Sequence, residues 1–203
     1  MFKDDIDLVT EKVAQYGLQL PALDAGGLAF PVVADYDITI RTGNQHARYL
    51  NLPEPPFTHV FGEYAITNPD GTDQPPIEKM PERDKWGTVV CLSTLEHVEN
   101  PFEVFNGLYR ILQPGGLLIL STVQSFPYHP SWNKDRTRID YPDNWRFTPS
   151  GLKILAQHSG FEILECEWRL QINADMGIKE IHTGVSQEII STYIVARKPN
   201  SEK

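Results

Sequence analysis

The second half of the chain shows the clearest alternation of apolar runs and turn residues. Residues 86–92 and 117–123 are almost continuously apolar, a pattern typical of strands that are buried on both faces of a parallel sheet. Between them, residues 101–112 repeat apolar side chains every three or four positions and predict an amphipathic helix. The Pro-Gly-Gly sequence at residues 114–116 then turns the chain into the second strand. This order predicts a strand, a crossover helix and a parallel strand.

The N-terminal part predicts a helix followed by a strand. Residues 5–16 place apolar side chains at helical spacing between charged ones, and Gly17 ends this leading helix, which we assign to residues 1–17. The apolar run 18–24 predicts the first strand. Residues 28–81 are rich in Pro, Gly, Asp and Asn, and within them only residues 58–65 predict a further strand.

The C-terminal part completes an alternating pattern. Thr148 can cap a helix that has Pro149 at its first position and stops at Gly160. Apolar runs at residues 161–168 and 191–197 predict the last two strands. The alternation predicts an α/β fold: an open sheet that is mostly parallel, with an antiparallel hairpin at its edge and helices on both faces.

Length and charge limit the kind of protein. A chain of 203 residues is long enough for one sizeable core, so we expect a single domain, 1–203. There is no run of about 18 apolar residues, and the first seven residues do not resemble a signal peptide, so we expect a soluble, cytoplasmic protein. The net charge of -9 disfavours nucleic acid and anionic membranes as partners. A small-molecule substrate fits better, while a monomer and a homodimer are both open.

Three ordered motifs resemble a known family. Within residues 86–101, the predicted buried strand 86–92 is followed by the polar side chains of Ser93, Thr94, Glu96 and His97. Residues 108–121 resemble the family's next helix, tight turn and fifth strand, and residues 145–152 resemble a later segment. The family is that of the class I S-adenosylmethionine-dependent methyltransferases, in the branch often called type 11 or 12. The resemblance, over residues 18–198, implies a Rossmann-like fold, a methyltransferase activity and S-adenosyl-L-methionine as cofactor.

The resemblance also implies where the cofactor's methionine part and ribose bind. Asp24, Gly26 and Gly27 follow the first strand and match the family's first motif, although Leu28 stands where a later glycine is usual. For the acid that accepts hydrogen bonds from the ribose hydroxyls, Glu63 is the best candidate unless the first crossover helix is missing. Two rival acids, Asp35 and Asp37, follow the first strand too closely for a complete crossover between two parallel strands.

The adenine is expected near residues 76–81. Ile77 and Met80 match the family's apolar contacts, and Glu78 either replaces a displaced acid or is a solvated charge in a loop. Residues at the end of the fourth strand of the family are expected to lie under the cofactor, and they are here Ser93, Thr94 and Leu95.

Methyl transfer to a hydroxyl needs an aligned acceptor and a group that takes its proton. His97 follows the buried strand directly, and an imidazole with an ordinary pKa of about 6.5 can act as a general base near neutral pH. The alternative is a structural histidine that is hydrogen-bonded to the backbone at the start of a helix.

The acceptor is expected at the aromatic segment 126–147. Aromatic faces next to His and Arg suit a flat or amphipathic organic molecule. The alternative is a lid that packs on itself, and for Trp145 and Phe147 packing is the favoured role. The candidate substrate-binding residues are Tyr128, His129, Trp132, Trp145 and Arg146.

No metal is expected. Both cysteines, Cys91 and Cys166, lie in apolar runs predicted as strands, which disfavours a zinc site or a disulfide. Four other side chains could in principle hold an ion: Glu96, His97, His129 and Asp135. Their spacing matches no recognised ligand motif.

Two other functions compete with methyl transfer. The incomplete first motif and displaced adenine acid allow a module of methyltransferase fold that has lost its cofactor and serves as a binding or partner protein. A nicotinamide-dependent oxidoreductase would need Gly-x-Gly-x-x-Gly after the first strand, which the sequence lacks.

Overall fold

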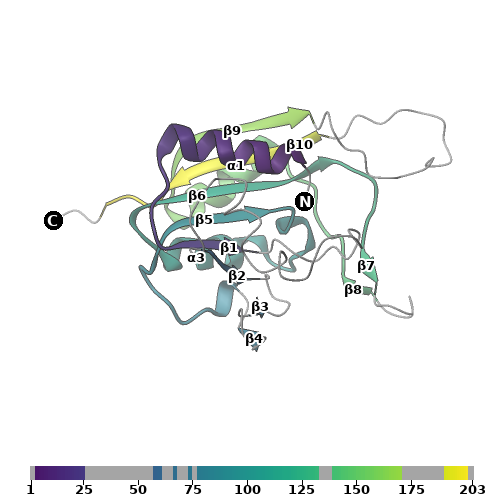
Figure 1. Cartoon of the computed structure of the whole chain (residues 1–203). Coiled ribbons are helices and arrows are strands. Elements are labelled where there is room, and N and C mark those ends of the chain that lie inside the picture. Colours follow the sequence, from purple (N-terminus) through teal and green to yellow (C-terminus); the bar gives the residue numbers. More distant parts are fainter. Residues whose placement is uncertain are drawn as a thin grey trace.

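The computed structural model describes residues 3–25, 57–60, 66–67, 73–74, 77–132, 139–170 and 190–200. Within these ranges one six-stranded sheet forms the centre of the molecule (Figure 1). Its order is β2 (Phe57–Val60), β1 (Ala22–Ala25), β5 (Trp86–Leu92), β6 (Leu112–Ser125), β10 (Ile190–Arg197) and β9 (Glu162–Leu170). The first four strands are parallel, and β10 is antiparallel to both β6 and β9. The predicted mostly parallel sheet with an antiparallel edge pair is confirmed.

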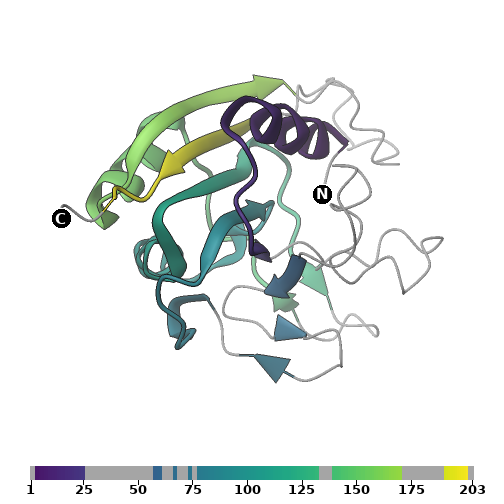
Figure 2. The same cartoon turned by 60° about the vertical axis from the view of Figure 1, so that its left-hand side comes forward.

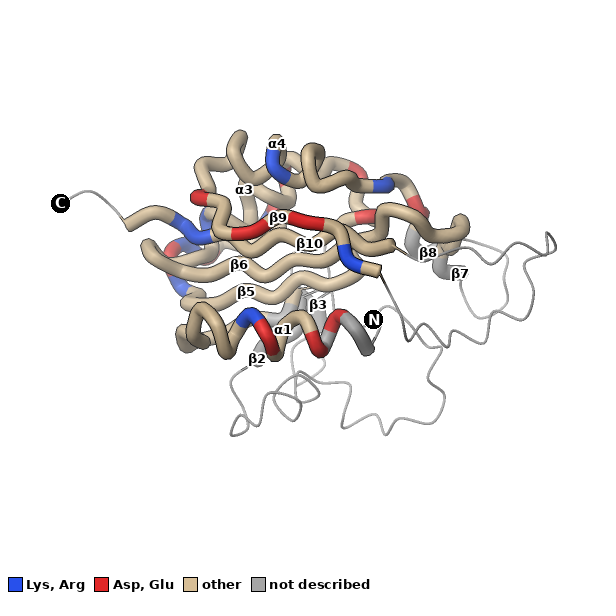
Figure 3. The backbone as a smooth tube through the Cα atoms, turned by 90° about the horizontal axis from the view of Figure 1, so that it is seen from above, with Lys and Arg blue, Asp and Glu red and all other residues tan. Residues whose placement is uncertain are grey.

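Helices cover both faces of this sheet. Seen from above, α1 (Lys3–Tyr16) lies on one face, and α3 (Pro101–Ile111) and α4 (Pro149–Ser159) lie on the other (Figure 3). The strand β5 alternates between two buried clusters. Val89 and Cys91 belong to the cluster with α3 and α4, whereas Val90 and Leu92 belong to the cluster with α1. Both faces of β5 are buried, which explains why residues 86–92 carry no polar side chain other than that of Thr88.

The predicted helix boundaries have clear causes. The Asn100 side chain accepts hydrogen bonds from the backbone N–H groups of Phe102 and Glu103 at the start of α3. Thr148 caps α4 in the predicted way, and Gly160 ends it in a left-handed conformation with φ of 92°. None of the helices in the described ranges is long and apolar enough to cross a bilayer.

Several predicted segments differ in detail. The first strand is shorter than predicted, because it comprises only Ala22–Ala25. The strand β6 starts at Leu112, and residues 114–116 lie within it, beside a shift of its pairing register with β5. The segment 126–147 is not simply a loop, because it contains a short antiparallel pair.

That pair is β7 (Ser131–Trp132) with β8 (Ile139–Tyr141). A second short pair, β3 (Ile66–Thr67) with β4 (Asp73–Gln74), lies beyond β2 in Figure 2. Two short 3₁₀ turns flank β5: η2 (Ile77–Lys79) before it and η3 (Leu95–His97) after it. Of the predicted strand 58–65, residues 57–60 form β2, and residues 61–65 lie outside the described ranges.

The strand order reverses between β1 and β5. From β1 the chain goes to β2 on one side, and the sheet continues through β5 on the other. In open α/β sheets the crevice at the carboxyl ends of two such strands is where ligands bind. The carboxyl end of β5 leads directly into residues 93–98, so these residues lie at the expected binding position.

Candidate active site

A buried glutamate lies at the centre of the polar groups beyond β5. The Glu96 side chain is 0% exposed, and its Oε2 accepts a hydrogen bond of 2.8 Å from Thr122 Oγ1 on β6. Its second oxygen, Oε1, has no hydrogen-bond partner in the described structure. Burial raises the pKa of Glu96, because a carboxylate loses its hydration there. An unpaired buried carboxyl oxygen is costly, and an ion, a water molecule or a catalytic role can account for one.

His97 is the next residue and is also buried. Its Nδ1 lies 2.7 Å from the carbonyl oxygen of Pro142, which can only accept, so Nδ1 carries a hydrogen. In the neutral ring the lone pair is then on Nε2, which lies 4.0 Å from Glu96 Oε1. The hydrogen bond to a backbone oxygen that a purely structural role of His97 would require is therefore present. It orients the ring so that Nε2 faces Glu96.

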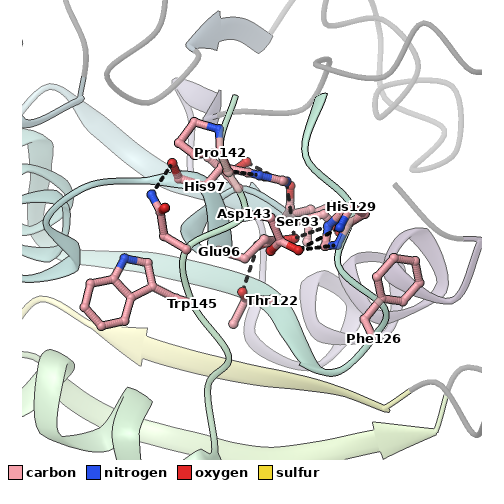
Figure 4. Close-up of polar contacts among 12 residues, drawn as sticks. Ser93, Glu96, His97, Thr122, Phe126, His129, Pro142, Asp143 and Trp145 are labelled. Atoms are coloured by element: carbon pink, nitrogen blue, oxygen red, sulfur yellow. Dashed lines mark hydrogen bonds and ion pairs between the residues drawn. The ribbon is translucent and has the colours of Figure 1, made fainter. Parts of the chain in front are cut away.

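His129 reaches the same glutamate from the segment after β6. Its Nδ1 lies 2.9 Å from Pro127 O and 3.1 Å from Asp143 Oδ2, and its Nε2 lies 3.9 Å from Glu96 Oε1. The two imidazole rings meet edge to face at 5.1 Å between centroids. Burial lowers the pKa of His129 and outweighs the opposing effect of Asp143. Figure 4 shows the three side chains gathered with Pro142 and Asp143 around them.

Asp143 and Arg146 hold the two halves of this segment together. Arg146 forms a two-pronged ion pair with the Asp143 carboxylate, with 2.7 Å between Nη2 and Oδ2, and also donates to the carbonyl of Phe126. The His129 backbone N–H donates to Asp143 at 2.8 Å. Burial alone would raise the pKa of Asp143, but the hydrogen bonds from Arg146 and His129 lower it. The guanidinium of Arg146, which was predicted to bind substrate, is thus engaged by Asp143 and by the Phe126 carbonyl in this conformation.

Asn144 and Trp145, which lie between Asp143 and Arg146 in the chain, hold the turn η3 in place. The Asn144 backbone N–H donates to the Glu96 carbonyl at 2.7 Å, and its side chain donates to the Val98 carbonyl at 3.1 Å. Trp145 Nε1 donates to the same Val98 oxygen at 2.8 Å, and its ring lies against Phe147. These contacts accord with the packing role favoured for the two aromatic residues.

The helix α1 contributes a buried acid to the site. Asp5 accepts hydrogen bonds from Ser121 Oγ at 2.5 Å and from Ser93 Oγ at 3.2 Å. Ser93 has a φ of 48°, a left-handed conformation that turns the chain sharply from β5 into η3. The end of β5, the strand β6 and the leading helix therefore meet near Glu96.

The other predicted site residues are distributed over three places. Thr94 and Leu95 are buried at the mouth of β5, and Tyr128 is 67% exposed next to His129. Ile77 and Met80 are buried against α3, where Arg110 donates to their carbonyl oxygens. Burial raises the pKa of Glu78, and its Oε2 is buried without a hydrogen-bond partner in the described structure.

Some predicted residues cannot be placed in the site. Asp24 pairs through its backbone with His59 and Val90 in the sheet, and its side chain lies outside the described residues. The same holds for the side chain of Trp132. Three further residues lie outside the described ranges altogether: Gly26, Gly27 and Glu63.

Sequence reasoning missed several residues of the site. The sequence offered Glu96 only as one of four side chains that could hold an ion. It did not predict the roles of Asp5, Thr122 and Asp143. The spacing of Asp143 and Arg146, three residues apart, was the one available signal, because such pairs can form local ion pairs. Asp5 and Thr122 carried no signal, since folding alone brings them to residue 96.

Comparison with known proteins identifies the family. A family model described as a methyltransferase domain matches residues 23–166, which is more than half of the chain. The chain belongs to this methyltransferase family. Curated relatives include a ubiquinone biosynthesis O-methyltransferase from Pseudomonas savastanoi, which is 42% identical over 50 residues. That match covers 25% of the methyltransferase and 21% of the relative, so it spans about a fifth of the relative's length.

Solved structures show the same fold at low sequence identity. One is the 1,6-didemethyltoxoflavin-N1-methyltransferase of Burkholderia thailandensis with bound 1,6-didemethyltoxoflavin and S-adenosylhomocysteine. It is 12% identical, with a TM-score of 0.57 and coverage of 97% of the methyltransferase and 79% of that chain. The [4+2]-cyclase SpnF is similar at 16% identity and a TM-score of 0.53, with coverage of 96% and 82%. The likenesses confirm the predicted Rossmann-like class I fold.

Proposed function

We propose that this methyltransferase transfers a methyl group from S-adenosyl-L-methionine to a hydroxyl of a small organic acceptor. The observation that carries the proposal is the cluster of buried Glu96 and His97 with half-buried His129 beyond β5, at the point where the strand order reverses. Buried titratable groups that converge at such a position are typical of active sites.

The residues at the carboxyl end of β5 fit the proposed cofactor. When bound, S-adenosyl-L-methionine supplies a methyl group on a positively charged sulfur. Asp5 and Glu96 place two buried carboxyl groups near this end of the sheet, and in its ionised form a carboxyl group there would attract a cationic ligand. The family motifs assign the remaining cofactor contacts, which stay predictions, to Asp24, Gly26, Gly27, Glu63, Ile77, Glu78, Met80, Ser93, Thr94 and Leu95.

His97 is the proposed catalytic residue. Its Nδ1 is held by Pro142 O at 2.7 Å, so the ring is oriented and Nε2 is the nitrogen that can act on an acceptor. Because the contact fixes one tautomer before the acceptor arrives, little reorganisation is needed for proton transfer.

The acceptor is proposed to bind between His97 and the exposed side of the segment after β6. Tyr128 is an exposed aromatic group there, and half-buried His129 follows it in the chain. Trp132, Trp145 and Arg146 stay predicted contacts of the acceptor. For Trp145 and Arg146 this requires a conformation in which the hydrogen bonds seen here are broken. The similarity to ubiquinone biosynthesis O-methyltransferases supports an oxygen acceptor. The cytoplasmic location and the lack of nucleic-acid or membrane partners also stay predictions.

A methyl-transfer assay tests this function. The purified protein is incubated with methyl-labelled S-adenosyl-L-methionine and a panel of small phenols, catechols and aliphatic alcohols. With an accepted substrate, His97→Ala should reduce turnover by about two to four orders of magnitude and leave the affinity for S-adenosylhomocysteine unchanged. His158→Ala, an exposed histidine on α4, is the matched control and should keep wild-type turnover. Normal turnover of His97→Ala would end the assignment of His97.

A further inference from the structure

Glu96, His97 and His129 form a cluster with the composition of a metal site. One ligand atom from each lies within 4.8 Å of the others. Two imidazole nitrogens and one carboxylate oxygen form a ligand set that zinc and other first-row divalent ions accept, leaving further positions open for water or substrate. We propose that these three residues bind a divalent transition-metal ion.

The buried oxygen of Glu96 is the observation that points to an ion. Oε1 has no hydrogen-bond partner in the described structure, although the side chain is completely buried. Both imidazole Nε2 atoms face it, but the separations of 4.0 Å and 3.9 Å are too long for hydrogen bonds. A cation among the three atoms would satisfy the carboxylate oxygen, which the protein leaves unpaired.

Both histidines are oriented in the way that metal ligands require. Nδ1 of His97 is engaged by Pro142 O, and Nδ1 of His129 lies against Pro127 O and Asp143 Oδ2. Such contacts fix the tautomer in which Nε2 is the coordinating nitrogen, and they are the usual outer contacts of metal-bound histidines. The contact of Arg146 with Asp143 in turn fixes that carboxylate.

A bound ion would draw the three side chains closer together. An ion about 2.0–2.1 Å from each of three tetrahedrally arranged ligands places them roughly 3.4 Å apart. The Glu96 oxygen would therefore approach each nitrogen by about half an ångström, which side-chain rotation of Glu96 can supply. The two nitrogens, which lie within 4.8 Å of each other, would approach by up to about 1.4 Å through rotation of the imidazole side chains. The sequence offered these three residues together with Asp135, which lies outside the described ranges, but no ligand motif joined them, because residue 129 is contributed by a different segment.

The ion would also narrow the acceptor class, a step that rests on the proposed function. A divalent cation stabilises a deprotonated hydroxyl oxygen, so an acceptor that offers such an oxygen is favoured. The hydroxyl proton then passes to solvent, the oxygen forms the new bond to the methyl carbon, and the carbon–sulfur bond of the cofactor breaks. With the ion bound, His97 Nε2 is a ligand and no longer takes the proton itself.

Metal titration of the full, untagged chain tests the site without any acceptor. The protein is treated with chelator, dialysed and titrated with Zn²⁺ by calorimetry and with Co²⁺ by visible absorption. We expect one binding site per chain and Co²⁺ bands of an ordered nitrogen and oxygen environment. His129→Ala should weaken binding at least 100-fold, and Asp143→Asn should weaken it about 10- to 100-fold. The control His158→Ala should leave the affinity unchanged.

Two outcomes would overturn the proposal. One is the absence of stoichiometric binding of either ion, and the other is unchanged binding by both His129→Ala and Glu96→Gln. The second variant keeps the shape of the side chain, and circular dichroism establishes that each variant is folded. A parallel titration with S-adenosylhomocysteine separates this inference from the proposed function. Zinc binding without cofactor binding supports the metal site alone, and the reverse supports the methyltransferase function alone.

Discussion

Glu165 on β9 joins the leading helix to the sheet. Its carboxylate contacts three side chains of α1: Lys12 at 2.7 Å, Gln15 at 2.9 Å and Tyr16 at 2.5 Å. Tyr193 of β10 adds a fourth contact at 3.2 Å. Replacement of this one side chain therefore tests how firmly α1 is held on the sheet.

We expect Glu165→Gln to destabilise the protein by about 2–3 kcal/mol. Hydrogen bonds to charged groups contribute about 1.5–3 kcal/mol each, but the amide retains one acceptor oxygen. The Lys12 side chain is only 6% exposed and loses one of its two carboxylate partners, while Glu165 is 20% exposed, so solvent screens part of the loss. The other partner of Lys12, Glu11 at 2.7 Å, remains.

The effect should depend on pH with a definite sign. Burial would raise the pKa of Glu165, but the hydrogen bonds from Lys12 and Tyr16 lower it more. A carboxyl whose pKa is lower in the folded state binds more protons when unfolded, so its contribution is present above the unfolded pKa of about 4.3. It is lost as the pH falls through the folded pKa. The difference between wild type and variant should be full at pH 7 and should shrink below about pH 4.

Denaturant unfolding of both proteins at pH 7 and at pH 3.5 measures the difference. At pH 7 the melting temperature of the variant should also fall, by roughly 4–12 °C for a chain of this size. Glu167→Gln, an exposed glutamate on the same strand, is the control and should change stability by less than about 0.5 kcal/mol. Equal stability of wild type and Glu165→Gln at pH 7, or a difference that is the same at both pH values, would refute the argument.

Three further substitutions test the packing and the site through their unfolding free energies. Glu96→Gln should stabilise the protein by about 1–3 kcal/mol, because a neutral amide is less costly to bury than a carboxylate with an unpaired oxygen, and a less stable variant would contradict this. Gly107→Ala should destabilise it by about 1–3 kcal/mol, because a Cβ there would lie 2.7 Å from the carbonyl oxygen of Ile77. Gly151→Ala, whose Cβ would meet nothing closer than 3.6 Å, is its control and should be neutral or stabilising. Asn100→Ala should cost about 1 kcal/mol through the lost cap of α3, and unchanged stability would exclude that role.

The elements around the active site could be predicted because each carries a local signal. The run from Trp86 to Leu92 is apolar on both sides, and the structure buries both sides. Thr148, Pro149 and Gly160 mark the ends of α4 by capping and turn chemistry that acts within a few residues. The edge pair β9 and β10 followed from strand order alone.

The cluster of Glu96, His97 and His129 could be predicted only in part, because its contacts join distant segments of the chain. His97 and His129 were recognised as candidates, but their convergence on Glu96 depends on how the segment after β6 folds back on η3. That path is fixed by hydrogen bonds from Asn144 and Trp145 to backbone oxygens, which no spacing rule predicts. Likewise, the contact of Asp5 with Ser121 joins residues 116 positions apart. The sequence therefore predicted the frame of the site more completely than its contacts.

Binding of S-adenosylhomocysteine tests the central claim most directly, because this product occupies the cofactor site without an acceptor. Purified protein is titrated by calorimetry, with Asp24→Ala as the variant at the predicted first motif and Glu167→Gln as control. We predict saturable binding to one site, lost in Asp24→Ala and retained in the control. No binding at millimolar ligand to the folded wild type would contradict the account and would favour a module of methyltransferase fold that no longer uses the cofactor.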